Sequence, residues 1–227
     1  MPQLEQGDLS AVAAQARQVT GSLVKWMDQG WDIVSIVPSC VLMMKQEWGS
    51  LLPQDKDVQR LGQSVKDISE YVTDIAKREG LVEGLQPVDA RVSLHNACHS
   101  RAQNVGFKAE EMLNYIPSLS ISVVESCSGH GGSWGVKKAT FPTALKVGER
   151  AVRRIVQDME EETKSDEQAT TQQPEKKHML SSECPLAADH IKQGLPDKAS
   201  TLMGEPKHPI EIMALAYQLD QAPLPLM

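Results

Sequence analysis

The 227-residue chain has no excess of basic residues, no long apolar run and no secretory start. Its formal net charge of -7 argues against a nucleic-acid surface, because such a surface needs basic side chains to meet the phosphates. No apolar stretch approaches the roughly 20 residues that a membrane-spanning helix requires. The first residues also lack the basic start and the apolar segment of a signal peptide. We therefore expect a cytoplasmic protein without a membrane span.

Cysteine is scarce as well, with Cys40, Cys98, Cys127 and Cys184 as the full set. Thiols stay reduced in the cytoplasm, so these four are not expected to form a disulfide framework. Their spacing fits no local Cys-x-x-Cys zinc knuckle. The glycine-rich loop after Cys127 could cradle a phosphate, but it lacks the Walker pattern. No base and nucleophile stand in an arrangement that indicates a hydrolase, and no catalytic residue is predicted.

The chain is long enough to bury a core, in one large or two small domains. Short β-branched runs alternate with apolar residues at helical spacing, which predicts an α/β fold of parallel sheets with covering helices. Strands are predicted at residues 31–37, 91–96, 119–125 and 179–182. Helices are predicted at residues 8–28, 41–48, 56–78, 108–115, 141–157 and 208–219, with a connector over 80–90.

Residues 158–177 differ in kind from the rest of the chain. They are charged and polar and contain almost no large apolar residue. Such a segment cannot bury a core, and we expect it to be a disordered acidic insertion.

Each of the four cysteines follows a predicted strand. The carboxyl ends of parallel strands meet at one edge of a sheet, so the four thiols could converge there. Converging thiolates in a reducing compartment indicate a metal or an iron–sulfur cluster, for which sulfur is the preferred soft ligand. The alternative is that they are buried and inert, as many cysteines are.

Three histidines, His95, His99 and His130, lie close to the cysteines in the sequence. A histidine beside a thiolate can donate a hydrogen bond to sulfur and raise the potential of a cluster. Alternatively, His95 points into the sheet and the other two are solvated. The basic turn from Lys146 to Arg154 is interpreted as a solvated helix face.

Five segments together resemble the cysteine-rich CCG-domain iron–sulfur oxidoreductases. That group includes the subunit designated C of anaerobic glycerol-3-phosphate dehydrogenase and the subunit designated B of heterodisulfide reductase. The segments are Val37–Met43, His95–His99, Ser126–His130, Ser182–Ala187 and His208–Glu211. The family pattern is a cysteine, a later Cys-Cys-Gly and then Cys-x-x-Cys, in each of two domains that bind iron–sulfur clusters.

The resemblance assigns each cysteine a place in that pattern. Cys98 matches the lone cysteine of the second domain, Cys127 the first cysteine of Cys-Cys-Gly, and Cys184 one cysteine of Cys-x-x-Cys. Cys40 is similar to a surviving cysteine of the first domain's Cys-x-x-Cys. The second cysteine of Cys-Cys-Gly is replaced by Ser128, and the last cysteine of the pattern by Ala187.

The resemblance implies one [4Fe–4S] cluster held by the four cysteines, with His95, His99 and His130 around it; zinc is the alternative. It also implies a division into the C-terminal half of a first CCG domain (1–55), a connecting helix and linker (56–90), and a complete second CCG domain (91–227). The chain then resembles the C-terminal portion of a longer protein, either a split subunit or a truncation.

The function implied is an iron–sulfur electron-transfer subunit that passes electrons between a dehydrogenase partner and a quinone or disulfide-type acceptor. The expected partner carries a ferredoxin-type module or a flavin and could hold the chain at the membrane periphery. The incomplete first domain would allow a homo-oligomer. The alternatives are a zinc-bound or metal-free CCG scaffold and a fragment without independent activity.

Overall fold

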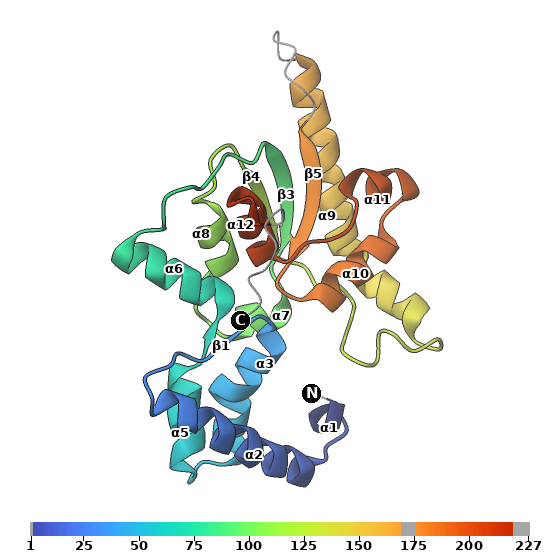
Figure 1. The fold of residues 1–227 in the computed structure, drawn as a ribbon. Helices are drawn as coiled ribbons and strands as arrows, with labels where there is room; N and C mark the ends of the chain where they lie inside the picture. Colours follow the sequence, from blue (N-terminus) through green and yellow to red (C-terminus); the bar gives the residue numbers. More distant parts are fainter. Residues whose placement is uncertain (1, 169–175, 220–227) are drawn as a thin grey trace.

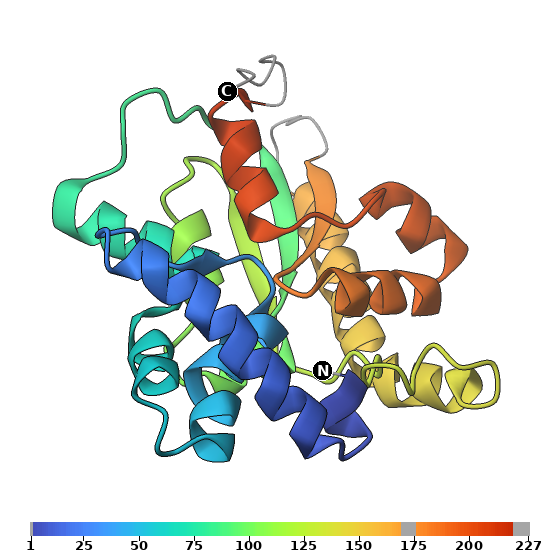
Figure 2. The ribbon, with the colours of Figure 1, turned by 60° about the horizontal axis from the view of Figure 1, so that its bottom comes forward.

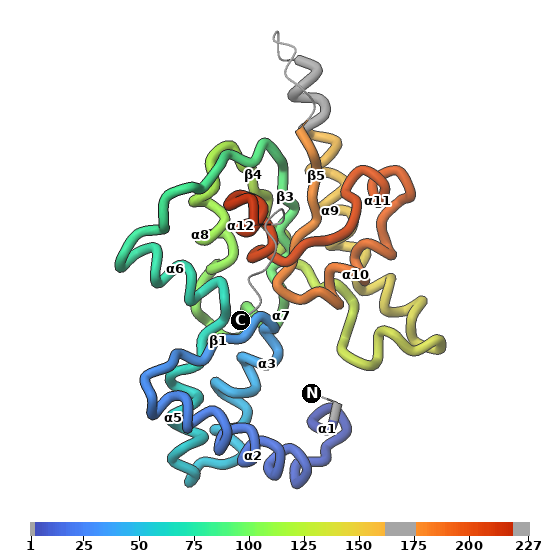
Figure 3. The backbone as a smooth tube through the Cα atoms, in the orientation of Figure 1, coloured from blue at the N-terminus to red at the C-terminus, as the bar shows by residue number. Residues whose placement is uncertain are grey.

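The computed structural model describes residues 2–168 and 176–219 (Figure 1), and Figure 3 draws the backbone as a tube in the same orientation. Its centre is a three-stranded parallel sheet in the order β4-β3-β5. A second parallel sheet has two short strands, β1 and β2. The strands are β1 (Val34–Ser35), β2 (Lys66–Asp67), β3 (Ala90–His95), β4 (Ser120–Val124) and β5 (Lys177–Ser182). The predicted α/β class with parallel sheets and covering helices is therefore confirmed.

Helices surround both sheets. The first group precedes the central sheet in the chain, and its helices α3 and α6 contact the small sheet: α1 (Pro2–Glu5), α2 (Leu9–Met27), α3 (Pro38–Leu42), a π-helical turn η1 (Met43–Glu47), α4 (Trp48–Leu51), α5 (Lys56–Ser64) and α6 (Ile68–Glu79). The second group accompanies the central sheet: α7 (Cys98–Ala102), α8 (Lys108–Leu113), α9 (Phe141–Gln168), α10 (Pro185–Gly194), α11 (Asp197–Met203) and α12 (Pro209–Ala216).

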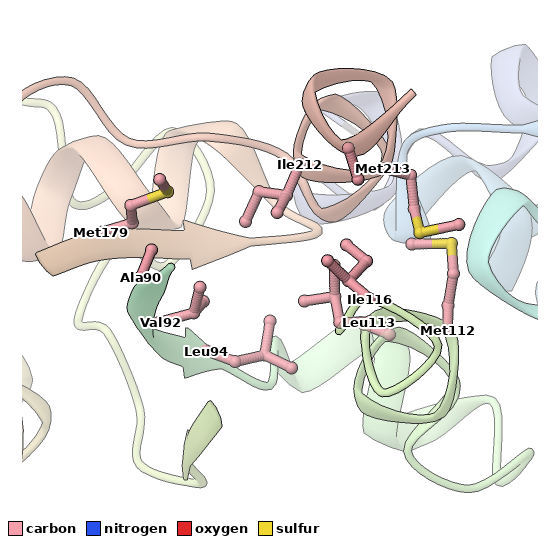
Figure 4. Close-up of a cluster of buried hydrophobic side chains, with 11 residues drawn as sticks. Ala90, Val92, Leu94, Met112, Leu113, Ile116, Met179, Ile212 and Met213 are labelled. Atoms are coloured by element: carbon pink, nitrogen blue, oxygen red, sulfur yellow. The ribbon is translucent and has the colours of Figure 1, made fainter. Parts of the chain in front are cut away.

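The central sheet is buried on both faces because its strands alternate between two apolar clusters. On one face, Val92 and Leu94 of β3 pack with side chains of α8 and α12, among them Leu113 and Ile212 (Figure 4). On the other face, Leu180 of β5 packs with residues of α9, α10 and α11. Apolar residues on both faces are typical of a parallel sheet covered by helices.

Helix α2 agrees with the helix predicted over residues 8–28. Asp8 caps α2 by accepting a hydrogen bond from the backbone N–H of Ala11, so the helix begins at Leu9. The predicted strand over 31–37 is shorter than expected, since only Val34–Ser35 pairs with β2. The helix predicted over 41–48 begins earlier, at Pro38, and continues through η1 into α4.

The single helix predicted over 56–78 is wrong. The chain leaves α5 at Val65, forms β2 beside β1, and starts α6 at Ile68. Asp67 caps the new helix in a capping box with Glu70. Strand pairing and this cap outweigh the helical spacing that continues through the segment.

The disordered insertion predicted over 158–177 is also wrong for its first part, because α9 continues to Gln168. Glutamate, lysine and glutamine have high helix propensity, and extending a helix costs less than nucleating one. Lys177, at the other end of the predicted insertion, is the first residue of β5. Residues 169–175 of the prediction lie outside the described residues.

No helix within the described part of the chain combines the length and the apolar character that a bilayer crossing requires.

A cysteine-lined cavity as the candidate functional site

The carboxyl ends of the three central strands lie side by side. His95, the last residue of β3, pairs with Val124 of β4 on one side and with Ser182 of β5 on the other. A cysteine follows each strand end within three residues: Cys98, Cys127 and Cys184. The register of the sheet therefore brings these three thiols to the same edge.

The three thiols line one cavity of about 350 Å³. Cys98 is the first residue of α7, Cys127 lies in the loop after β4, and Cys184 is the N-cap residue of α10. Burial raises the pKa of the Cys184 thiol, and the neighbouring Cys98 acts in the same direction. All three belong to the set predicted from the sequence, and the structure brings them together.

Cys40 lies elsewhere. It is the third residue of α3 and lines a separate cavity of about 280 Å³ with Met43, Met44 and side chains of α1 and α2. Helix α1 contributes to both cavities, with Gln3 in the Cys40 cavity and Glu5 in the three-cysteine cavity. Cys40 is therefore not among the residues that line the three-cysteine cavity, although α3, which carries it, packs on α7, which begins at Cys98.

The loop after β4 holds Cys127 by close backbone contacts. The backbone N–H of Gly129 donates to Cys127 Sγ over 3.4 Å. Gly129 has a φ of 81°, and a Cβ there would stand 2.0 Å from the carbonyl oxygen of Ala144 in α9. From the other side, a Cβ on Gly148 would stand 2.3 Å from the carbonyl oxygen of Ser128. The loop can lie this close to α9 only because both positions are glycine.

His95 is buried at the sheet edge and fully hydrogen-bonded. Its Nε2 lies 2.9 Å from the Ser126 carbonyl oxygen, so Nε2 carries the proton and donates. Its Nδ1 then accepts from the Ser182 hydroxyl at 3.0 Å. Burial lowers the pKa of His95, which favours this neutral ring. His95 thus ties together the chain segments that carry Cys127 and Cys184.

His130 and His99 line the three-cysteine cavity. Nδ1 of His130 accepts the backbone N–H of Gly132 at 3.2 Å, so the proton of the neutral ring is on Nε2. Burial lowers the pKa of His130, and His190 acts in the same direction. In this tautomer the ring has a donor at Nε2 and no free lone pair for a metal.

Two further residues at the site were missed from the sequence. Glu5 of α1 lines the cavity, and one of its carboxylate oxygens accepts the Ser133 hydroxyl at 3.0 Å; Figure 2 shows α1 beside the glycine loop. His190 of α10 is 3% exposed, and its Nδ1 donates to the Ser128 carbonyl oxygen at 2.9 Å. Neither carries a local signal, because Glu5 is far in sequence from all three cysteines and His190 lies within an ordinary amphipathic helix.

Ser128 and Ala187 line the same cavity as the three cysteines. The sequence resemblance implied cysteines at these two positions. The three thiols and both positions therefore surround one cavity, although they come from the loop after β4 and from the starts of α7 and α10.

A buried acid pair lies directly behind the site. Glu183, next to Cys184, is 5% exposed, and Asp67 of β2 is 3% exposed. Burial raises the pKa of Glu183 to about 7, and the negative charge of Asp67 acts in the same direction. Burial also raises the pKa of Asp67, although a backbone hydrogen bond from Ser69 opposes it. The pair joins the small sheet to the edge of the central sheet.

This pair predicts a stability that falls as the pH rises. The unfolded Glu183 carboxyl has an ordinary pKa near 4.5, whereas the folded one has a pKa of about 7. The contribution of the Glu183 proton to the free energy of unfolding is therefore complete below pH 4.5. It falls by roughly 3 kcal/mol as the pH rises through 7. We expect Glu183→Gln to remove this loss, so that urea unfolding at pH 8 shows a variant more stable than the wild type.

The control for this prediction is Glu47→Gln, which changes an exposed carboxylate in η1 and should unfold in parallel with the wild type at every pH. A Glu183→Gln variant whose stability relative to the wild type is the same at pH 5 and pH 8 would contradict the prediction.

Within the described residues, no group of three or more His, Cys, Asp or Glu side chains is arranged so that it could hold a metal ion.

The chain is similar to the subunit designated C of anaerobic glycerol-3-phosphate dehydrogenase from Escherichia coli strain K12, with 27% identity over 131 residues. The same figures hold for the corresponding protein from Escherichia coli O157:H7. The match covers 56% of this chain and 32% of each relative. The chain thus spans about a third of the length of the curated relatives it matches. No family model matches it. No solved structure matches it either.

Proposed function

We propose that this chain is an electron-transfer subunit of a dehydrogenase complex and that it holds one iron–sulfur cluster in the three-cysteine cavity. The observation that carries the proposal is the convergence of Cys98, Cys127 and Cys184 at the aligned ends of three parallel strands. The distant similarity to a subunit named for an anaerobic dehydrogenase supports the same class of function.

The donor set fits a cluster. Three thiols provide soft sulfur ligands. The N–H of Gly129 already donates to Cys127 Sγ, a contact that stabilises a thiolate. His130, with its proton on Nε2, is the candidate for a further hydrogen bond to sulfur. When bound, the cluster would supply a one-electron carrier; the chain supplies ligands and hydrogen bonds.

Cys98, Cys127 and Cys184 are the proposed ligands, with His95, His99 and His130 around them. Cys40, the fourth ligand predicted from the sequence, lines a different cavity in this structure and is not in the set that we propose. Glu5 is the side chain of α1 that reaches the three-cysteine cavity and is the alternative at the fourth position.

The proposed partners are a redox protein that carries a ferredoxin-type module or a flavin dehydrogenase, with a quinone or a disulfide-type compound as the acceptor. The two-stranded sheet of β1 and β2 supports a partner or a second copy of the chain, because so small a sheet has backbone edges that another strand can pair with.

The test is anaerobic purification followed by iron, sulfide and zinc analysis and by EPR of the reduced protein. About four irons and four sulfides per chain with a reducible signal would support a [4Fe–4S] subunit. Zinc, or no metal even after reconstitution with iron and sulfide, would favour the zinc-bound or metal-free scaffold and would remove the electron-transfer function.

Ala187→Cys offers a gain-of-function prediction. Ala187 lines the cavity and occupies a cysteine position of the resembling family. We expect the added thiol to increase the iron and sulfide retained after reconstitution, because a further thiolate ligand slows cluster loss. Ala188→Cys, also buried but outside the set that lines the cavity, is the matched control. Equal iron retention in the two variants would contradict the prediction.

A further inference from the structure

A second cleft, of about 470 Å³, lies between the carboxyl end of β4 and helix α9. Three arginines of α9 line it: Arg150, Arg153 and Arg154. Residues three and four apart share one face of a helix, so the three guanidinium groups project on the same side. The sequence alone indicated a solvated face for this basic turn, whereas the structure places it against the end of a strand.

One of the three arginines is held in place by a buried acid. Asp158 is 7% exposed, and its Oδ1 lies 3.0 Å from Nε of Arg154. The other oxygen of Asp158 accepts the hydroxyl of Ser122 in β4 at 2.5 Å. Because Arg154 is bound through Nε, the four N–H donors of its two terminal nitrogens remain at the outer end of the side chain.

The other two arginines are available to a ligand. Arg153 approaches Glu149 only to 3.9 Å, and both side chains are exposed, so this pair is weak. Arg150 forms no salt bridge with any residue that the structure describes. One acidic residue, Glu125, lines the cleft. Among the residues that line the cleft, three arginines therefore stand against one carboxylate, in a chain whose net charge is -7.

We propose that this cleft binds a small anion with at least two negative charges, the phosphate or dicarboxylate end of a small molecule. Planar guanidinium groups bind such oxygens in pairs, and the carboxyl ends of parallel strands are where α/β proteins place their ligands. The volume is within the usual range of small-molecule sites.

The cleft and the cysteine cavity lie on two sides of one short segment. Ser126 lines the cleft, and its carbonyl oxygen accepts the hydrogen bond from His95, which lines the cysteine cavity. An anion in the cleft would thus lie beside Ser126, the residue that directly precedes Cys127. The binding itself does not depend on a cluster, so its failure is distinct from a failure of the proposed function.

The test is isothermal titration calorimetry of the purified chain with inorganic phosphate and, separately, with succinate, at an ionic strength held constant with sodium chloride. The wild type is expected to bind at least one of them saturably. Phosphate alone would identify a phosphorylated ligand, and succinate alone a dicarboxylate. Saturable binding of neither would overturn the proposal.

Two variants locate the binding. Arg150→Gln with Arg153→Gln is expected to weaken it at least about tenfold, because charged hydrogen bonds are lost. Arg154 is kept, since its removal would leave Asp158 buried without its partner. Glu125→Gln should instead tighten binding, because it removes the one acidic side chain that lines the cleft.

The control is Lys25→Gln with Lys56→Gln, two exposed lysines of α2 and α5 whose loss changes the net charge equally. This variant should bind like the wild type. Unchanged affinity in the double arginine variant, equal weakening in the lysine control, or no gain with Glu125→Gln would each place the anion outside this cleft.

Discussion

Cys127→Ala is expected to reduce the iron and sulfide of the anaerobically purified protein to background and to abolish the EPR signal of the reduced state. Cys127 is one of three thiols around the cavity, so its loss leaves two cysteine ligands. It also removes the sulfur that accepts the N–H of Gly129. Two thiolates from α7 and the start of α10 are too few to retain a cubane cluster.

Cys98→Ala and Cys184→Ala should have the same effect, and Cys40→Ala is the matched control. Cys40 lines a different cavity, so its replacement should leave iron, sulfide and the EPR signal intact. Thermal unfolding would check that each variant folds; Cys40, Cys98 and Cys127 are exposed, which makes a large loss of stability unexpected. Full iron in Cys127→Ala would overturn the cluster assignment, and iron loss in Cys40→Ala would place Cys40 among the ligands.

Gly148→Ala is expected to destabilise the fold and to displace the Cys127 loop. In an ordinary helix this change stabilises by up to about 1 kcal/mol, because alanine has the higher helix propensity. Here the new Cβ would stand 2.3 Å from the backbone carbonyl oxygen of Ser128, which cannot rotate away as a side chain can. Forcing an extra methyl group into such packing costs about 1–3 kcal/mol, and the backbone contact favours the upper end.

Gly21→Ala is the control for Gly148→Ala. Gly21 lies in the middle of α2, and a Cβ there would meet nothing within 4 Å. Urea unfolding should show Gly21→Ala at or above wild-type stability and Gly148→Ala well below it. In Gly148→Ala, iron retention after reconstitution should fall as well, because the loop that carries Cys127 has moved. Equal stability of the two variants would show that the loop is not packed against α9 as described.

Local sequence was sufficient for the elements whose patterns are short-ranged. The helix from Leu9 and the strands that precede Cys98, Cys127 and Cys184 follow from spacing, β-branched runs and a capping aspartate. Local sequence failed for 56–78, where an apolar spacing typical of one helix continues across β2. The partner of β2 is β1, some 30 residues earlier, and a local pattern does not include that contact.

The sequence alone determined which residue types follow the strands. It therefore determined that the candidate site offers soft sulfur ligands. Which of them share a cavity was decided by the tertiary structure. The register of β3 with β4 and β5 brings three cysteines together, whereas Cys40, which follows a strand of the other sheet, lines its own cavity. Glu5, His190 and the arginine-lined cleft likewise depend on packing between distant segments, because proximity across a fold is a property of the folded chain and not of any window of its sequence.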